Sequence, residues 1–137
     1  MKKLTGRRLN LWNLCKNYVI FRADGWCELC KARGRKTFGT EVDHAFTRGI
    51  SKLFYDTRNL TLLCHECHDA KGHVRSGIGG PVHEIVEKRE GKDWYEKAKL
   101  LYSSKSGQPL TNLDIENLEK EISSKFEYGE DRSRAVC

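Results

Sequence analysis

The sequence predicts a small α+β fold in which two short strands and several helices surround a four-cysteine metal site. Two Cys-x2-Cys pairs, 33 residues apart, carry this prediction. Two residues between cysteines let both thiolates reach one tetrahedral ion from a tight turn. Strand-length apolar segments lie between and beside the pairs, and helical periodicity dominates the flanking residues. The 137 residues suit one domain with a modest core, which a metal would help to stabilise.

The four paired cysteines are interpreted as ligands of one structural zinc ion: Cys27, Cys30, Cys64 and Cys67. The alternatives are two unrelated reduced pairs or a disulfide framework. No long apolar run follows Lys2 and Lys3, so neither a signal peptide nor a membrane partner is expected, and the cytoplasm is the expected location. That compartment keeps thiols reduced, which favours metal ligation. Cys15 is predicted to be a packed thiol, and Cys137 has no predicted role.

The N-terminal elements follow from periodicity and turn residues. Residues 8–22 have helical spacing, and Asp24-Gly25 ends that helix. Residues 31–36 form a short basic loop after the first cysteine pair. Residues 38–46 are predicted as the first strand and Leu60–Leu63 as the second, joined by a loop over residues 47–58. A helix is expected to start within the second cysteine pair.

The C-terminal part is predicted to be helical. Glycines make residues 72–82 a connection, and residues 83–103 follow as a helix that Gly91 interrupts. Thr111 or Asn112 caps a last helix that runs to about Phe126, and residues 127–137 are expected to be a loose charged tail. The expected division is residues 1–82 for a basic helix and metal-stabilised core, and residues 83–137 for a helical extension packed on the same domain.

The net charge of +6 is concentrated near the N-terminus. Residues 1–36 carry ten Lys or Arg residues against only Asp24 and Glu28. A basic surface attracts phosphate backbones without specifying sequence. The alternative is a solvated, solubilising face. Charge alone leaves both interpretations open, and the motif described next favours DNA as the partner. No separate domain for sequence recognition is found in the sequence.

A second set of chemical groups is interleaved with the cysteines. Asp43-His44 lies near the end of the first predicted strand, Asn59 opens the second, and His68 directly follows the last paired cysteine. In this order the chain resembles the HNH endonucleases of the ββα-metal family, in the subgroup stabilised by four cysteines. The resemblance covers residues 27 to about 73. Residues 11–24 and 42–49 also look like small phage HNH proteins of the NinG-like kind, which would place the protein in a host-cell cytoplasm.

The resemblance implies a metal-dependent DNA endonuclease with a one-metal mechanism. His44 would be the general base, and Asp43 and His68 would bind a catalytic Mg²⁺, Mn²⁺, Ni²⁺ or Zn²⁺ ion. Asn59 would hold the loop and orient the base, although an ordinary turn or cap is its alternative role. For both histidines the alternative is a surface position. Hydrolysis would leave 5′-phosphate and 3′-hydroxyl ends.

The predicted DNA contacts are cations near this motif: Arg33, Arg35, Lys36, Arg48, Lys52 and Lys71. The NinG-like resemblance adds protein partners in phage DNA processing or recombination. A non-catalytic zinc-containing DNA-binding or assembly module on an HNH scaffold is the main alternative. A redox protein using its Cys-x2-Cys pairs would need a βαβ context that the sequence lacks. Duplex, nicked, flap and branched DNA all stay open as substrates, as does the oligomeric state.

Overall fold

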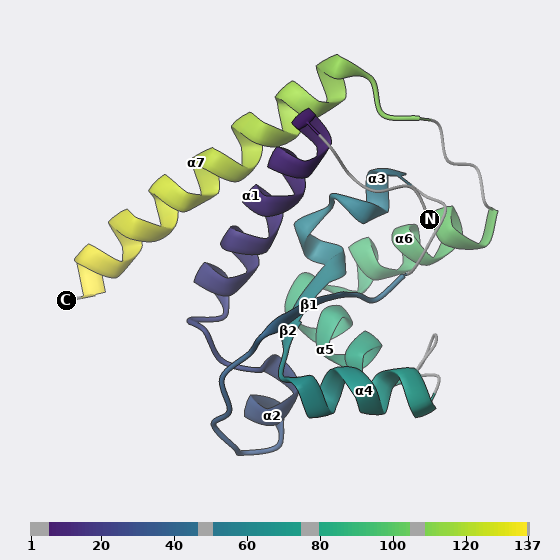
Figure 1. The fold of residues 1–137 in the computed structure, drawn as a ribbon, viewed down its shortest axis with the longest axis vertical. Helices are drawn as coiled ribbons and strands as arrows, with labels where there is room; N and C mark the ends of the chain where they lie inside the picture. The colour runs from purple at the N-terminus through teal and green to yellow at the C-terminus, as the bar shows by residue number, and fades with distance from the viewer. Residues whose placement is uncertain (1–5, 47–50, 75–79, 105–108, 137) are drawn as a thin grey trace.

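A two-stranded sheet lies near the middle of the molecule, with helices on both sides (Figure 1). The computed structural model describes residues 6–46, 51–74, 80–104 and 109–136. In chain order its elements are α1 (Gly6–Arg22), α2 (Glu28–Ala32), β1 (Glu41–His44), α3 (Ser51–Phe54), the 3-10 turn η1 (Thr57–Asn59), β2 (Leu60–Leu63), α4 (His65–Val74), α5 (Pro81–Glu90), α6 (Lys92–Ser104) and α7 (Asn112–Val136). The predicted α+β class is confirmed.

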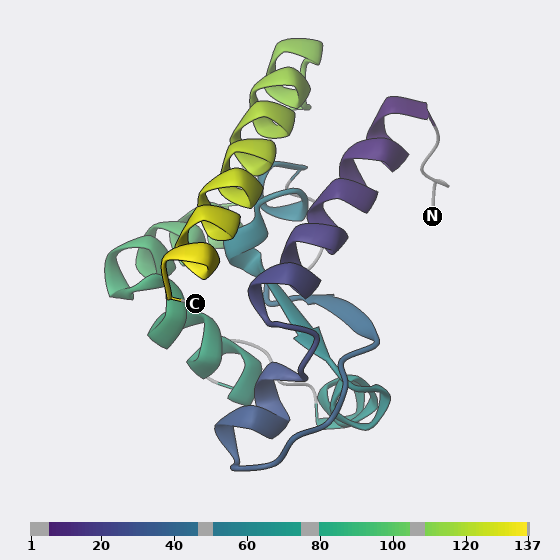
Figure 2. The same ribbon diagram turned by 90° about the vertical axis from the view of Figure 1, so that its left-hand side faces the viewer.

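Two apolar clusters form the core, one on each side of the hairpin. Helices α1 and α7 run side by side, as both Figure 1 and Figure 2 show, and α1 also contacts β2. Their cluster includes Leu11, Cys15, Val19, Leu60, Leu62, Ile115 and Ile122. The other cluster joins the paired cysteines to Phe46, Leu63, Val82, Val86, Tyr95 and Ala98. The hairpin is thus enclosed on both faces, and burying its apolar residues stabilises its register.

The two strands pair antiparallel, with Glu41 opposite Leu63 and His44 opposite Leu60. The second strand has the predicted bounds, but the first is shorter than the predicted 38–46. The Thr40 amide still donates to Leu63 O (2.9 Å), but residues 37–39 pair with the first cysteine segment: the Cys27 amide donates to Thr37 O (2.7 Å) and the Gly39 amide donates to Gly25 O (2.8 Å). Because these backbone groups are hydrogen-bonded to one another, they cannot form further ladder hydrogen bonds with β2.

Gly39 sits where the chain passes close to the core. A Cβ atom built on it would lie 2.3 Å from Cγ of Leu62, whose side chain is fully buried. We expect Gly39→Ala to destabilise the protein by about 1–3 kcal/mol, because a buried leucine has no room to retreat. Urea unfolding would measure the loss. The comparison variant is Gly34→Ala. No atom lies within 4 Å of a Cβ built on Gly34, so its cost comes from the positive φ of the backbone and not from a steric clash. Wild-type stability of Gly39→Ala would contradict the close packing.

A half-buried ionic network ties three helices to the edge of β2. The Glu28 Oε2 atom accepts from the Leu62 amide (2.8 Å), and Oε1 accepts from Nη1 of Arg89 (2.7 Å). The Arg22 guanidinium donates through Nη2 to Leu60 O (2.7 Å). Burial lowers the pKa of Arg22, with the nearby Arg89 charge as a second cause. Glu28 and Glu90 offset this repulsion, so the network holds the ends of α1, α2 and α5 together.

The C-terminal helices agree in part with those predicted from the sequence. Gly91 separates α5 from α6 with φ 96°, a conformation that glycine adopts without strain. The α7 N-terminus is capped by Thr111, whose hydroxyl accepts from the Asp114 amide (3.1 Å) while Asp114 Oδ2 accepts from the Thr111 amide (2.9 Å). The expected loose tail is wrong, since α7 continues to Val136. The tail contains two Glu, two Arg and one Ala, which favour helix, and charge alone does not prevent a helix from forming.

None of the helices in the described ranges combines the length and the apolar character that crossing a bilayer requires.

Helix α5 contacts both α2 and β2, while α7 contacts α1. The predicted division between residues 82 and 83 stays a prediction.

Candidate functional site

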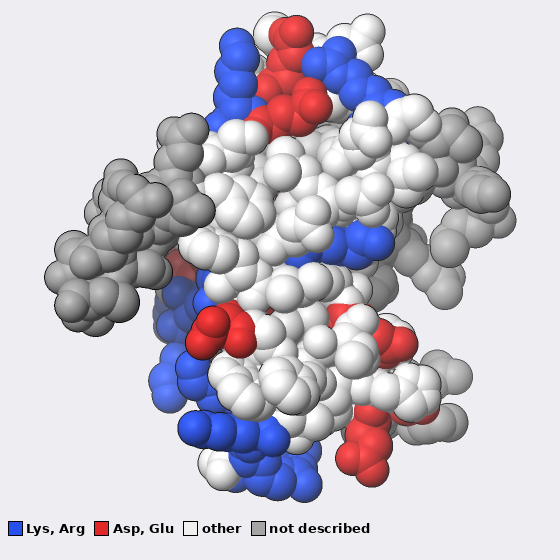
Figure 3. All heavy atoms as spheres, turned by 60° about the vertical axis from the view of Figure 1, so that its left-hand side comes forward, with Lys and Arg blue, Asp and Glu red and all other residues white. Residues whose placement is uncertain are grey.

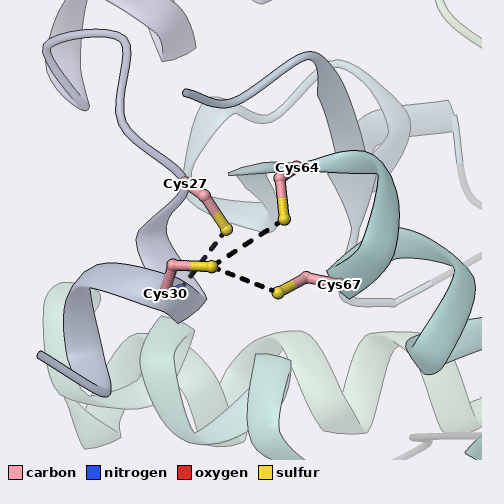
Figure 4. Close-up of side chains that lie close together, drawn as sticks. All are labelled: Cys27, Cys30, Cys64 and Cys67. Carbon is pink, nitrogen blue, oxygen red and sulfur yellow. Dashed lines mark hydrogen bonds between the residues drawn. The ribbon is translucent and has the colours of Figure 1, made fainter. Parts of the chain in front are cut away.

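The four paired cysteines converge from two segments (Figure 4). Cys27 caps α2 and Cys30 lies within it, while Cys64 follows β2 and Cys67 lies on α4. All four are buried, and their sulfur atoms lie within 4.8 Å of one another. The Cys30 sulfur is 3.8 Å from that of Cys64 and 3.6 Å from that of Cys67. Thiolates bound at about 2.3 Å around a tetrahedral ion would stand about 3.8 Å apart, so this cluster fits one metal ion.

The surroundings of the cysteine thiols affect their charge differently. Burial raises the pKa of Cys27 and of Cys67. A hydrogen bond from the Thr37 side chain lowers the pKa of Cys30 to about 7. A bound divalent cation would stabilise all four thiolates, which are the soft donors that zinc prefers. The four cysteines therefore form a potential metal site, as predicted.

A second group of donors lies where β1 faces α4. Asp43 is buried, and its Oδ1 atom lies 3.5 Å from Nδ1 of His68. Glu41 is two residues earlier on the same face of the strand, and its Oε2 atom lies 3.6 Å from Nε2 of His68. Two ligands bound at about 2.1 Å to one ion stand about 3.0–3.4 Å apart, depending on its geometry. The separation of Asp43 and His68 is close to that range.

The buried Nδ1 atom of His68 has no hydrogen-bond partner among the described residues. A buried nitrogen of this kind is costly unless something binds it. The Asp43 carboxylate beside it is a hard oxygen donor and the imidazole is a borderline nitrogen donor. Such a pair suits a divalent cation with remaining positions open to water or substrate. The residues present therefore fit the cation that the sequence resemblance implies.

His44 points to the other side of the strand, toward α1. Its ring stacks on Trp12 (centroids 5.1 Å apart, planes at 11°) and contacts the Phe54 ring. Its Nε2 atom lies 3.0 Å from the Phe54 carbonyl oxygen. A carbonyl oxygen can only accept, so Nε2 carries the hydrogen, and in the neutral ring the basic lone pair is on Nδ1. The aromatic neighbours fix the ring plane while this hydrogen bond fixes the tautomer.

Asn59 is fully buried and bonds both ends of the loop that follows β1. Its Oδ1 atom accepts from the Phe46 amide (2.8 Å), and its Nδ2 atom donates to Phe46 O (3.0 Å) and Leu53 O (2.9 Å). One amide side chain thus closes the loop between residues 46 and 53. Leu53 precedes Phe54, so Asn59 also holds the segment whose carbonyl binds His44.

The comparison with protein families bears on this same segment. Residues 27–74 match the family model of HNH endonucleases. The predicted resemblance is confirmed for these residues, called the HNH segment below, and it supports a nuclease-type function. No curated protein and no solved structure matches the chain. The NinG-like relationship stays a prediction.

The predicted DNA contacts all fall within the HNH segment. Arg33, Arg35 and Lys36 are exposed in the loop after α2, and Lys52 is exposed on α3. Lys and Arg atoms gather at the lower end of the face in Figure 3, at the level of α2. Arg48 lies outside the described residues. Lys71 lies on α4, but its side chain is likewise not described.

Three features of the HNH segment and its surroundings were not predicted from the sequence. Glu41 could have been found, because the two-residue period of a strand places it beside Asp43. The Phe54 carbonyl has no sequence signal. His83 is buried on α5, where its Nε2 donates to Ala45 O (2.7 Å) and its Nδ1 accepts from the Tyr95 hydroxyl (2.9 Å). Both nitrogens are engaged, so His83 anchors the end of β1 rather than binding metal.

Proposed function

We propose that the protein is a metal-dependent DNA endonuclease, with His44 as general base and Asp43 and His68 as ligands of one catalytic divalent cation. The cysteine cluster holds a structural zinc ion that keeps the site assembled. Asn59 orients the base through the loop that it closes. Zinc is chosen because the donor set is four sulfurs at tetrahedral separations.

The observation that supports this function best is the hydrogen bond from His44 to Phe54 O (3.0 Å). A surface histidine would have no fixed tautomer, whereas this one directs its basic nitrogen to the side that the carbonyl does not occupy. The adjacent residue, Asp43, lies beside His68 of α4, with Oδ1 of Asp43 3.5 Å from Nδ1 of His68. A proton acceptor and a cation site thus come from consecutive residues at one strand end.

The chemistry follows from these positions. Nδ1 of His44 takes a proton from a water molecule as the water oxygen attacks the scissile phosphorus. The bond from phosphorus to the 3′ oxygen then breaks, and that oxygen is protonated by solvent. The products carry a 5′ phosphate and a 3′ hydroxyl. When bound, the cation held by Asp43 and His68 supplies positive charge against the negative charge of the transition state.

The nucleic-acid partner is inferred from charge. The most basic part of the chain, residues 1–36, precedes the HNH segment and overlaps its first ten residues. The cations that follow α2 are exposed. Contacts of Lys and Arg with phosphates position DNA but do not read its sequence. We therefore propose weak sequence specificity, with choice among substrates made by DNA structure.

The test is a cleavage assay on linear, nicked, flap and four-way DNA with magnesium, manganese, nickel or zinc. We expect cleavage that needs an added cation and yields ends that a ligase can reseal. Resealing requires a 5′ phosphate beside a 3′ hydroxyl, so it checks the direction of bond breakage. Folded, zinc-loaded protein that binds DNA but cuts none of these substrates would instead favour a non-catalytic DNA-binding module.

A further inference from the structure

A stacked aromatic pair stands on the surface beside the first cysteine segment. The rings of Trp26 and Phe38 lie 4.8 Å apart at an interplanar angle of 9°. An isolated antiparallel bridge between the same two residues fixes this arrangement from the backbone. Phe38 is 70% exposed, the highest value of any aromatic side chain among the described residues. Burial of Phe38 in the core therefore does not account for its position.

The surroundings of this pair are basic. Residues 29–40 contain four Lys or Arg residues and no acidic residue. Lys31, Arg33, Arg35 and Lys36 are all exposed. Nζ of Lys36 lies 5.9 Å from the centroid of the Trp26 ring. An exposed flat ring amid cations is complementary to a nucleic-acid strand, which carries flat bases on a chain of phosphates.

We propose that the Trp26–Phe38 pair is a stacking platform for an unpaired base of the DNA substrate, with the neighbouring cations binding its phosphates. Aromatic side chains bind single strands by stacking, which tolerates any base because every base has a π face. Bases paired within a duplex are stacked on each other and do not offer a face to Phe38. The platform therefore selects DNA that has unpaired nucleotides.

The platform is close enough to act on the same substrate as the proposed site. Asp43 is five positions after Phe38, so their Cα atoms are at most about 18 Å apart. At about 3.4 Å per nucleotide along one strand of a duplex, this span corresponds to at most about five nucleotides. The inference rests on the proposed function and narrows it to substrates with a single-stranded segment near the cleaved bond, such as flaps.

The test compares Phe38→Ala, Phe38→Leu and Phe38→Trp with Leu100→Ala, a truncation at an α6 residue that is also 70% exposed. Binding to a single-stranded oligonucleotide and to a duplex of the same length is measured without added magnesium or manganese, so that DNA stays intact. Phe38→Ala and Phe38→Leu should each lose roughly five- to hundredfold in affinity for the single strand. Their duplex affinity should change less than about twofold. Phe38→Trp should retain single-strand binding, and Leu100→Ala should match the wild type.

Neutralising Arg33, Arg35 and Lys36 together gives a different signature. Affinity for both DNA forms should fall, with a shallower dependence on salt, because phosphate contacts do not distinguish single strands from duplexes as stacking does. Phe38→Leu retains an apolar cover over Trp26 but removes the π face. Wild-type single-strand binding by Phe38→Leu would therefore overturn the platform, as would equal losses for single strand and duplex.

The binding readout separates this inference from the proposed function. Selective loss of single-strand binding in Phe38→Ala, in a protein that cuts no DNA, would support the platform and contradict the nuclease. Cleavage with an unaltered preference among flap and linear DNA in Phe38→Ala would support the nuclease and contradict the platform. Thermal unfolding and zinc content of each variant verify that the exposed substitution leaves the fold intact.

Discussion

Replacement of His44 by alanine should slow DNA cleavage by roughly 10²–10⁴-fold, the usual contribution of a positioned general base. The substitution removes the proton acceptor next to Phe54 but leaves Asp43 and His68 in place. Binding of DNA, zinc and the catalytic cation should therefore stay close to wild type. Single-turnover cleavage rates, together with manganese titration, measure both expectations. Added imidazole should restore part of the activity by supplying a base.

His68→Ala should fail in a different way. The variant loses one ligand of the proposed cation, so manganese affinity should fall by more than about tenfold, because even residues that only support metal ligands cost that much. Excess manganese should then recover part of the cleavage rate. It should not recover His44→Ala to a comparable degree, because that variant lacks a proton acceptor rather than a cation.

His65→Ala provides the matched control for both histidines. His65 is exposed on α4, next to the same cysteine pair. Its Nε2 atom lies 3.1 Å from Oδ2 of Asp69, and its Nδ1 atom lies 3.6 Å from Oε1 of Glu41, which is not one of the two proposed cation ligands. Its removal should change cleavage and manganese affinity by less than about twofold, within the range of ordinary surface substitutions. Rapid cleavage by His44→Ala, or undiminished manganese affinity in His68→Ala, would show that the two roles are wrongly assigned.

Removal of the structural metal should unfold the HNH segment. Binding of structural zinc contributes about 10–16 kcal/mol in small zinc-dependent domains, which matches or exceeds the total stability of about 5–15 kcal/mol of a typical protein. Cys30 and Cys67 connect α2 to α4 across a sulfur–sulfur distance of 3.6 Å, and no disulfide replaces them among the described cysteines. We expect elemental analysis to find one zinc ion per chain, and circular dichroism to show loss of structure when a strong chelator removes it.

Cys15→Ala separates this effect from the general cost of losing a buried thiol. Cys15 is fully buried in the α1 cluster and donates to Tyr55 O (3.5 Å), and burial raises its pKa to about 12. It is thus a packed thiol, as predicted. Cys15→Ala should retain one zinc ion and lose only about 1 kcal/mol, whereas Cys30→Ser should lose zinc and fold poorly. A well-folded Cys30→Ser variant without metal would contradict a structural role for the ion.

Local patterns in the chain predicted much of this fold. The Cys-x2-Cys spacing identified the metal cluster because a tight turn brings two such thiols together in any fold. The segment Leu60–Leu63, which contains three leucines and Thr61, identified β2, whose side chains are all buried between the two clusters. Helical periodicity identified α1, and Gly91 marked the break between α5 and α6. The C-terminal end of α7 was missed because high charge was interpreted as disorder, although the same residues favour helix.

What the sequence determined by itself was therefore local: the α+β class, the four-cysteine cluster, and the match to the HNH family model of residues 27–74, which include Asp43, His44, Asn59 and His68. Tertiary structure alone decided which groups meet across the chain. It brought Phe54 O to His44, enclosed Glu28 between Arg22 and Arg89, and stacked Phe38 on Trp26. The physical reason is that a ligand spacing depends on a few covalent bonds, whereas these contacts depend on how distant segments pack.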